Sequence, residues 1–507
     1  MKHFDPEAFS ATSEQSFAQL YPALAAIGAH RPQLLKDFER ILRDARRFRR
    51  EQIEPNALRV ERAVMQNPEY VAEDVIRAAC EYGFFSTMIP RAFGGAGLSF
   101  GAMIIAMEEL GAGCLGISNL IGVHGLALAT VSATGDLGAM EKLSRLLTNG
   151  ERVGRPHLLS TGITEPSAGT DVEDVDFLRS ARLVSEATPV RGGYRVNGRK
   201  VFISNGSIAQ THVVILPTDR KRPVETTFAF MIDSTTPGFR VGRVERKMGQ
   251  KACPAVELVF EDCFIPEAAR IHSKPLPGRS IELVLGATRG GVGAWGTAAA
   301  RGAFERALAH ARTRRLGGRF LIDHQWVQIK LADMQRNVML ARASYVDAML
   351  SNELFGLSLL ASKKGMNDLQ RLMPRSVLDS SPVKKIMTSR RAREGFQAAI
   401  DQLEDWEVDT ASAHGAATKV SCTDLGMQNC HLALDVFGAA GLRHDAGIEK
   451  IYRDAKLLQI YEGTNQLNRI ELYKRGVNRG ATGIDLEPPP PRPEPEVARD
   501  DVMEARS

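Results

Sequence analysis

The chain has 507 residues, of which 44% are hydrophobic, 25% charged and 6% aromatic, a composition typical of a globular enzyme and too apolar for a disordered chain. A length of this order favours about two to four domains. The net charge of +5, from 65 basic and 60 acidic residues, is too slight to indicate a dedicated nucleic-acid-binding protein.

The cysteines and the N-terminus bear on the cellular compartment in which the protein is expected. Six cysteines are present without a C-x-x-C pair, which argues against a disulfide scaffold or a thiolate zinc site, and we expect no bound metal. Residues Met1 to Glu7 contain no apolar signal segment, and no apolar run approaches the ~20 residues that cross a bilayer. We therefore expect a cytoplasmic protein without a membrane span.

The first part of the chain, residues 1–155, is predicted to be a helical domain. Between Leu34 and Phe48 the apolar residues recur at helical spacing, with charged residues on the opposite face. Two further helical patterns cover residues 73–82 and 101–111.

Residues 156–278 are predicted to form a β-domain, a barrel or a sandwich. Asn197-Gly198 separates two β-rich stretches, 194–196 and 201–203, and such a pair is a strong hairpin signal because both turn residues need positive φ. Strand-like runs follow at 212–216, 227–232, 239–244 and 257–265, punctuated by Gly and Pro.

Residues 279–480 are predicted to be a C-terminal four-helix bundle. Its helical stretches are 280–310, 320–350, 424–437 and 449–474, interrupted by an insertion rich in Lys and Arg at about 351–410. We expect that insertion to be solvated, with a clamp for phosphate groups as the alternative. The Pro-rich residues 481–507 are predicted to be a disordered tail. The layout is an α+β multi-domain fold.

Common catalytic motifs are absent from the sequence. We find no G-x-S-x-G elbow, no H-E-x-x-H, no Walker A motif and no Rossmann G-x-G-x-x-G followed by a suitable acidic residue. Three other segments concentrate hydroxyl, Gly and charged residues: Thr161 to Asp171 (TGITEPSAGTD), Lys200 to Gly206 (KVFISNG), and Ile451 to Gln466 (IYRDAKLLQIYEGTNQ). Each taken singly is compatible with ordinary turn chemistry.

Together, in this order and spacing, the three segments resemble the signatures of the acyl-CoA dehydrogenase family. Lys247-Met248-Gly249 with Glu257 to Asp262, and Ile89-Pro90 with Phe93-Gly94-Gly95, add to the resemblance, which covers roughly residues 35–478. The family fold, an N-terminal helical domain, a β-domain and a C-terminal four-helix bundle, matches the predicted layout.

The resemblance implies non-covalently bound FAD and assigns residues to it. Thr164 would hydrogen-bond the flavin pyrimidine, Thr161 and Ile163 would flank the ring, Phe202 would pack on it, and Ser204 would contact its N5 edge. Arg314 and Gln325 match residues that hold the FAD of a neighbouring subunit, in a homodimer or homotetramer. The remaining expected contacts are Gly438, Thr464 and Gln466 to the FAD, and Thr170, Arg289 and Gly463 to the acyl-CoA substrate.

Glu462 matches the catalytic base of the family. In the implied reaction a carboxylate removes the α-proton of an acyl-CoA thioester while the β-hydride goes to flavin N5, which gives the trans-2-enoyl-CoA. Burial should raise the pKa of that carboxylate toward working pH. Some relatives carry the base on a helix just before an Arg; here Thr288 precedes Arg289, so that position has no carboxylate. Electrons would pass to an electron-transfer flavoprotein.

The sequence departs from the family at two FAD-contacting segments. The R-x-T-F-G segment is Arg314 to Gly318 (RRLGG), and a Gln and a Gly near the expected diphosphate are replaced by Asp435 and Ala439. FAD affinity or the dimer contact is therefore expected to differ from the family norm.

Two alternatives remain open from the sequence. One is a flavin-dependent oxidase or monooxygenase on the same fold acting on a non-CoA substrate, against which the presence of Glu462 argues. The other is a non-enzymatic or nucleic-acid-binding relative, against which the modest charge argues. The identity of the acyl group stays undetermined.

Overall fold

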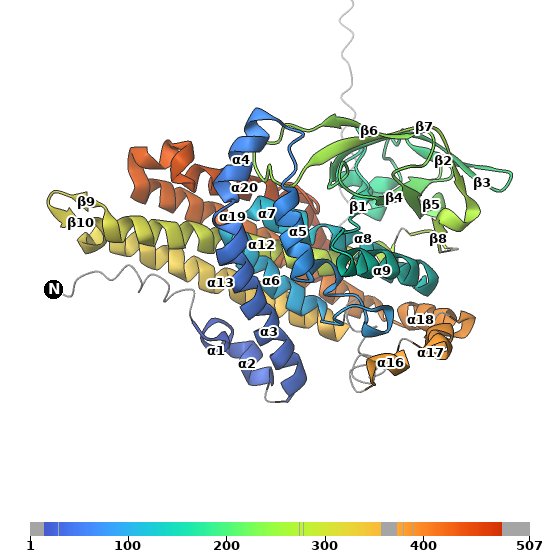
Figure 1. Cartoon of the computed structure of the whole chain (residues 1–507), viewed down its shortest axis with the longest axis horizontal. Coiled ribbons are helices and arrows are strands. Elements are labelled where there is room, and N and C mark those ends of the chain that lie inside the picture. The colour runs from blue at the N-terminus through green and yellow to red at the C-terminus, as the bar shows by residue number, and fades with distance from the viewer. Residues whose placement is uncertain are drawn as a thin grey trace, which may run out of the picture.

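The computed structural model describes residues 15–478, apart from 29, 273, 277, 356–372, 379 and 388 (Figure 1). The predicted tail at 481–507 and the middle of the basic insertion lie outside the described residues. Helices at the N-terminus, a β-domain and a long helical bundle follow one another along the chain, as predicted.

The N-terminal helices surround one fully buried helix. They are α1 (Phe17–Leu20), α2 (Pro22–Gly28), α3 (Pro32–Phe48), α4 (Ala57–Gln66), α5 (Glu73–Glu81), α6 (Phe100–Gly113), α7 (Leu115–Gly122), α8 (His124–Thr134) and α9 (Leu137–Arg152). Helix α6 is buried on all sides because α3 packs on one side of it and the bundle helix α12 (Arg279–Thr313) on another. Its sequence is accordingly apolar on every side, apart from Glu108 and Glu109.

A buried ionic network ties these helices to the bundle. The carboxylate of Glu108 on α6 accepts hydrogen bonds from Tyr21 (3.2 Å), from Tyr345 (2.5 Å) and from Arg342 Nη2 (2.5 Å). Burial raises the pKa of Tyr21 well above its usual range, whereas the facing Arg342 and Arg301 hold the pKa of Glu108 at about 2 in spite of its burial. The α1–α2 segment is therefore fixed by polar as well as apolar contacts.

One stretch, Leu115–Thr134, passes the length and hydropathy test for a membrane span, although the sequence pattern did not indicate one. It consists of α7 and α8, and 72% of its most apolar window is buried inside the fold. Core helices pass the same test because they too are apolar on every side.

The β-domain is a sandwich of two four-stranded sheets. One has the order β1-β4-β5-β8 and the other β2-β3-β7-β6. The bounds are β1 (Leu159–Gly162), β2 (Glu186–Val190), β3 (Gly193–Ser204), β4 (Thr211–Pro217), β5 (Thr227–Asp233), β6 (Phe239–Val244), β7 (Ala255–Pro266) and β8 (Arg270–Ile271), with the short helices α10 (Val175–Leu178) and α11 (Pro223–Thr226) between them. Their facing side chains, including Val196, Phe230 and Leu258, form one apolar core.

The predicted hairpin turn at Asn197-Gly198 is wrong. Both residues lie inside the continuous strand β3, and the turn is at Arg191-Gly192, where Gly192 has φ +83°. Gly198, with φ +132°, instead marks an irregularity in the pairing of β3 with β7. The Asn197 side chain accepts a hydrogen bond from the Asp262 backbone N–H at 2.8 Å. Asn197 and Gly198 therefore belong to a bulge between β3 and β7.

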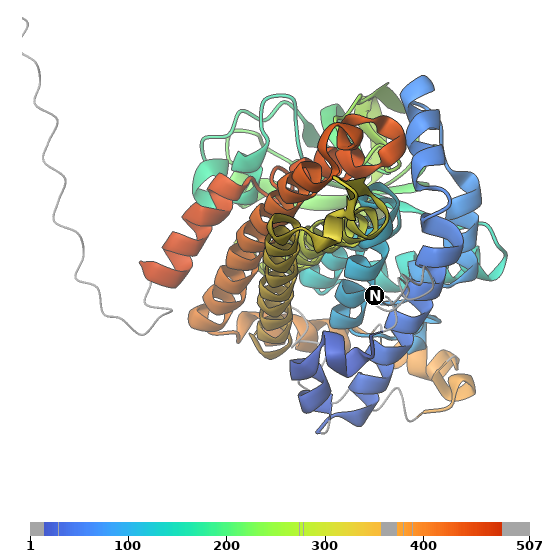
Figure 2. The same cartoon turned by 90° about the vertical axis from the view of Figure 1, so that its left-hand side faces the viewer.

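The C-terminal bundle is built from α12, α13 (Gln325–Phe355), α19 (Asp405–Phe437) and the shorter α20 (Ile448–Leu458) and α21 (Asn465–Leu472). Figure 2 views these helices from the outer end of the bundle. Glycines let α12 and α19 approach closely: a Cβ on Gly296 would lie 2.6 Å from the backbone carbonyl carbon of Cys422. The Gly-rich stretch Arg289 to Gly293 also lies inside α12.

The second half of the basic insertion is helical and packs beside the start of α12. It contains α16 (Arg375–Leu378), α17 (Ser381–Met387) and α18 (Arg390–Asp401). Arg279 Nη1 donates to the Leu403 carbonyl oxygen at 2.6 Å, and Leu283, Ile400 and Leu403 share a small apolar cluster. At the other end of the bundle, β9 (Arg315–Leu316) and β10 (Arg319–Phe320) form a hairpin between α12 and α13.

All six cysteines are buried and none is paired. Cys80 and Cys114 lie in the N-terminal helices, Cys253 and Cys263 in the β-domain, and Cys422 and Cys430 in the bundle.

Candidate active site

The first two sequence segments meet at one edge of the β-domain. The backbone N–H of Val201 donates to the Thr164 carbonyl oxygen at 2.9 Å, which places Thr164 beside Phe202. Thr161, in the middle of β1, has a buried hydroxyl without a hydrogen-bond partner in the described part of the chain. Phe202 has φ +57° and is 59% exposed, because the pairing of β3 with β7 is interrupted there. Ser204 follows at the end of β3.

A buried ion pair fixes the loop that contains Thr164. Lys200 Nζ donates to Glu165 Oε1 at 2.8 Å and to the Ile163 carbonyl oxygen at 2.8 Å. The other carboxylate oxygen of Glu165 accepts from the backbone N–H groups of Val184 and Ser185. With its partners satisfied, this pair can be buried, although burial still lowers the pKa of Lys200.

Glu462 lies in the loop between α20 and α21, which breaks the single helical stretch predicted for 449–474. Glu462 has φ +55° and Gly463 φ +74°, so two successive residues adopt the left-handed conformation. Lys419 Nζ donates to the Gly463 carbonyl oxygen at 2.6 Å, and the Thr464 hydroxyl accepts from the Leu467 N–H at 3.2 Å as the N-cap of α21. Strained backbone held in this way is typical of a functional position.

The Glu462 carboxylate is partly buried, and its neighbours shift its pKa in opposite directions. Burial raises its pKa, while the Thr288 hydroxyl, which donates to Oε2 at 2.7 Å, and the cations Arg289 and Lys419 act to lower it. Arg289 Nε also donates to the Glu462 carbonyl oxygen at 3.4 Å. Thr288, which aligns with the alternative base position, thus contacts Glu462 directly.

Glu173 is a second carboxylate in the site, and the sequence interpretation missed it. Its Oε2 atom lies 3.8 Å from Arg289 Nη2. Burial raises the pKa of Glu173 to about 7, and the nearby Glu462 adds to the rise against Arg289. Glu173 lies two residues beyond the last residue of the quoted segment, Asp171, so only an extension of that segment would have found it.

Glu462 and Glu173 line one apolar cavity between the β-domain, α8 and α12. Ile163 and Lys200 border it from the β-domain, and the other lining residues are Leu126, Thr130, Ala133, Val172, Leu178, Leu183, Ile215, Pro217, Thr227, Leu276, Ser280, Ile281, Val284 and Leu285. Thr170 begins the short 3-10 helix that ends at Glu173 and so lies near this cavity. An apolar chain with a reactive end beside Glu462 fits this lining.

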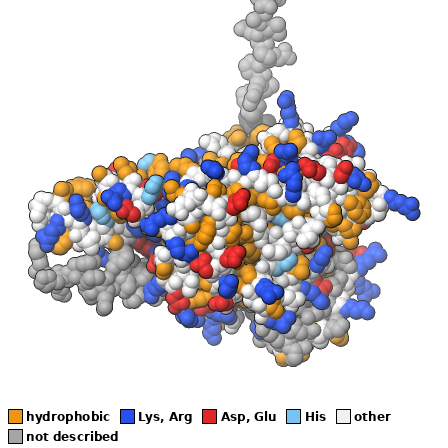
Figure 3. All heavy atoms as spheres, turned by 45° about the horizontal axis from the view of Figure 1, so that its top comes forward, with side chains coloured by type: hydrophobic (Ala, Val, Ile, Leu, Met, Phe, Trp, Pro, Cys, Tyr) orange, Lys and Arg blue, Asp and Glu red, His pale blue; other side chains and the backbone are white. Residues whose placement is uncertain are grey.

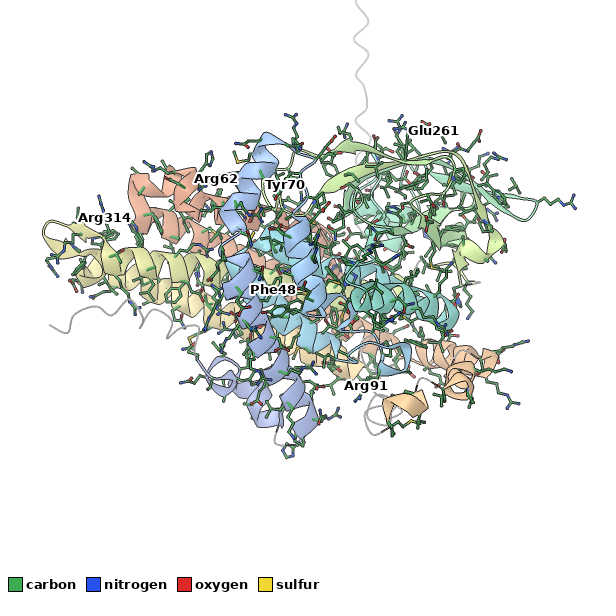
Figure 4. The ribbon with its side chains drawn as sticks, in the orientation of Figure 1. Phe48, Arg62, Tyr70, Arg91, Glu261 and Arg314 are labelled. Carbon is green, nitrogen blue, oxygen red and sulfur yellow. The ribbon has the colours of Figure 1, made fainter. Side chains whose placement is uncertain are left out.

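Three predicted cofactor residues lie elsewhere. Arg314, Gln325 and Gly438 are exposed at the outer end of the bundle, where the His310 and Phe437 rings stack at 4.1 Å (Figure 4 labels Arg314). Asp435, at the same end, is paired with Lys330 at 2.7 Å. Gln466 is exposed at the start of α21. A single subunit therefore does not bring all the predicted FAD contacts together.

The outer face of the β-domain does not form a basic surface. Cross-strand ion pairs balance its charges, among them Arg199 with Glu257 (3.3 Å) and Arg240 with Glu261 (3.0 Å). Figure 3 shows acidic and basic side chains interspersed at this end. Within the described ranges, no group of three or more His, Cys, Asp or Glu residues could hold a metal ion.

Comparison with known proteins gives the class. Models of the acyl-CoA dehydrogenase N-terminal, middle and C-terminal domains match residues 36–151, 160–263, and 279–353 with 385–477. The chain therefore belongs to the acyl-CoA dehydrogenase family, whose members are flavoprotein oxidoreductases. The match leaves residues 354–384 of the basic insertion uncovered.

Similar proteins extend over most of the chain. The acryloyl-CoA reductase (NADH) of Anaerotignum propionicum is 27% identical over 447 residues, covering 88% of this chain and 96% of the relative. The short-chain-specific acyl-CoA dehydrogenase of Clostridium acetobutylicum is 28% identical over 444 residues, covering 86% and 97%. A chain in a structure of the electron transferring flavoprotein of Acidaminococcus fermentans has a TM-score of 0.69 at 26% identity, covering 87% and 98%.

Proposed function

We propose that the protein catalyses α,β-dehydrogenation of an acyl-CoA thioester to the trans-2-enoyl-CoA, with Glu462 as the base. The observation that supports this most directly is the position of Glu462, a partly buried carboxylate in a strained loop at the wall of an apolar cavity. The same cavity borders the β-domain edge where the flavin-contacting residues of the family are expected.

FAD fits the residues at that edge. The orphaned Thr161 hydroxyl offers a polar partner, and the exposed ring of Phe202 offers an apolar face for a flat ring system. Ile163, Thr164 and Ser204 would complete the contacts to the isoalloxazine. When bound there, FAD would supply the hydride acceptor that the reaction requires.

The chain's own residues then perform the proton transfer. Burial holds the pKa of Glu462 above that of a free glutamate, which makes the carboxylate a stronger base toward the weakly acidic α-proton. The Thr288 hydroxyl orients that carboxylate, and Arg289 holds the loop through the Glu462 carbonyl oxygen. The apolar lining excludes water, so the charge that develops during proton removal is not screened.

The partners follow from the same proposal. We propose a cytoplasmic enzyme that forms a homodimer or homotetramer and passes its electrons to an electron-transfer flavoprotein. The likeness to a chain from an electron transferring flavoprotein structure supports that acceptor. The exposed position of Arg314 and Gln325, at the outer end of the bundle, is what an FAD contact across a subunit interface requires.

Anaerobic titration of the purified yellow protein with acyl-CoAs of different chain type tests the proposal. Loss of flavin absorbance is expected with at least one acyl-CoA in the unaltered protein and, as an order of magnitude, about 100-fold more slowly in Glu462→Gln. Bleaching that proceeds at the original rate in Glu462→Gln would refute the base assignment. Absence of bleaching with every acyl-CoA would favour an oxidase or monooxygenase with a non-CoA substrate.

A further inference from the structure

The dehydrogenation gives no role to Glu173, although this carboxylate lines the same cavity as Glu462. It ends the 3-10 helix Thr170–Glu173, and its side chain is only 17% exposed. Its Oε2 atom and Arg289 Nη2 both lack a hydrogen-bond partner within residues 15–478 as described, although they are only 3.8 Å apart. The two groups therefore attract each other electrostatically without a hydrogen bond. Other charges nearby can change the strength of this attraction.

The charges that face Glu173 come from three other parts of the chain. Arg289 belongs to α12, Lys419 to α19, and Glu462 to the loop between α20 and α21. The Gly463 backbone N–H faces the Glu173 carboxylate from that same loop. Two carboxylates therefore compete for the same two cations.

The polar groups on the far side of Glu173 already have partners of their own. A small second cavity there is bordered by Asp174, Glu282, Glu471 and Arg475. Arg475 donates to Glu282 at 2.6 Å and to Glu471 at 2.8 Å, and Asp174 accepts from Lys474 at 2.8 Å. The charged groups that act on the ionisation of Glu173 are consequently mainly Arg289, Lys419 and Glu462.

We propose that Glu173 is a positioning residue for the base: by competing with Glu462 for Arg289 and Lys419, it determines how readily Glu462 accepts the α-proton. This inference rests on the proposed dehydrogenation. It places a second proton-binding carboxylate in the site, which acts through the charge of Arg289 and does not itself contact the reacting carbon.

The titration behaviour of the cluster agrees with this geometry. The pKa of Glu173 is raised to about 7 by burial and by Glu462, and burial lowers the pKa of Lys419 to about 7. Two interacting carboxylates lose their protons in two steps that belong to the pair. Glu462 opposes the ionisation of Glu173, so Glu462 ionises first, while Glu173 is still protonated. Once Glu173 ionises in turn, at about pH 7, its charge raises the proton affinity of Glu462 and strengthens it as a base.

The test is the pH dependence of kcat/KM in Glu173→Gln, an isosteric change without the charge. Because Glu173 is still protonated where Glu462 ionises, the acid limb should stay in place, but the further rise of kcat/KM that ionisation of Glu173 produces at about pH 7 should be lost, which lowers kcat/KM above that pH by about threefold. A carboxyl-stretch infrared titration without substrate should show that the carboxyl titrating at about pH 7 is lost and that the other titrates as before.

Two control variants separate a specific charge effect from a general one. Glu173→Asp keeps the charge and should restore most of the rise of kcat/KM at about pH 7. Asp176→Asn removes an exposed carboxylate on the neighbouring helix α10, outside the cavity, and should leave the whole pH profile unchanged.

The outcomes distinguish this inference from the proposed function. An active Glu173→Gln enzyme that keeps the rise of kcat/KM at about pH 7 and the infrared titration of the unaltered protein would overturn the inference and leave the dehydrogenation intact. If the unaltered protein bleaches with no acyl-CoA, the proposed function fails, and the infrared titration alone still decides whether the two carboxylates interact.

Discussion

Glu462 combines two unfavourable features in one residue: a left-handed backbone conformation without glycine, and a carboxylate removed from water. The surrounding contacts offset both. Lys419 and Asn468 bind the carbonyl oxygen of the next residue, Gly463, and Thr288 donates to the carboxylate. The position of the proposed base is therefore defined by side chains from α12, α19 and α21, which are far apart in the sequence.

Thr288→Val should move the acid limb of kcat/KM to higher pH. The Thr288 hydroxyl stabilises the ionised form of Glu462, so its loss raises the pKa of Glu462 further. At a fixed pH below the limb, kcat/KM should fall by about tenfold for every pH unit that the limb moves. Glu173→Gln, in contrast, is expected to leave this acid limb in place. The profile is measured with the acyl-CoA that bleaches the flavin fastest.

Thr288→Ser is the matched control for that variant, because it keeps the hydroxyl and should keep the limb. An unchanged limb in Thr288→Val would show that the hydroxyl does not contribute to the ionisation of Glu462.

At this scale the sequence predicted the residues that stand inside recognisable segments and missed those that reach the site from elsewhere. Thr164, Phe202 and Glu462 could be proposed because their neighbours form a pattern. Lys419 and Glu173 were missed because a single Lys in an amphipathic helix, or a Glu in a turn, has many ordinary explanations. Only the folded arrangement shows that both approach Glu462.

Among the elements, close contact between α12 and α19 holds the bundle together, and it depends on glycines at the crossing. A Cβ on Gly296 would contact the backbone of Cys422, and a Cβ on Gly426 would contact the Gly296 carbonyl oxygen. Each helix therefore approaches the other at a position without a side chain. A Cβ in such a place must displace backbone, which a closely packed interior resists.

Gly296→Ala should therefore lower the free energy of unfolding by about 1–3 kcal/mol, although alanine is the better helix former. Gly395→Ala in α18 is the matched control, because a Cβ there meets nothing within 4 Å. It should be neutral or stabilise by up to about 1 kcal/mol. Denaturant unfolding of both variants measures the difference, and equal effects would show that the close helix contact does not matter for stability.

The errors of prediction at the level of elements have local causes. Asn197-Gly198 forms a hairpin turn only where the chain reverses direction. Here the single strand β3 continues through the pair because the residues before and after it both pair with β7. Helix α19 begins at Asp405, well before the stretch predicted from 424, because its first half is rich in Ala, Ser and Thr and shows little apolar periodicity. The order of helices and strands was predictable, since the apolar periodicity and the Gly and Pro residues between elements are clear in the other segments.

In the whole molecule, the predicted FAD contacts divide between two ends. Thr161, Thr164 and Ser204 lie at the β-domain, whereas Arg314 and Gln325 lie at the outer end of the bundle. No sequence pattern indicates this separation, because it depends on the length and direction of α12 and α13. The separation has a testable consequence if Arg314 serves a neighbouring subunit.

Mixed oligomers of Glu462→Gln and Arg314→Ala subunits should regain activity that neither variant has alone. In a mixed pair, the subunit with Arg314→Ala keeps its own Glu462 and receives an intact Arg314 from the other subunit, so one complete site forms. Co-expression with two affinity tags, followed by flavin content and turnover, measures this. Activity no higher than that of the Arg314→Ala protein alone would place the role of Arg314 within its own subunit.

The buried cysteines can be used to detect local opening of the structure. A thiol reagent in solution can react only when the surrounding structure transiently opens, so each labelling rate measures the stability of one region. With two thiols in the N-terminal helices, two in the β-domain and two in the bundle, mass spectrometry of the labelled peptides would show which region opens first. Binding of a ligand in the cavity should then slow labelling of Cys253, Cys422 or both, according to the region that the ligand tightens.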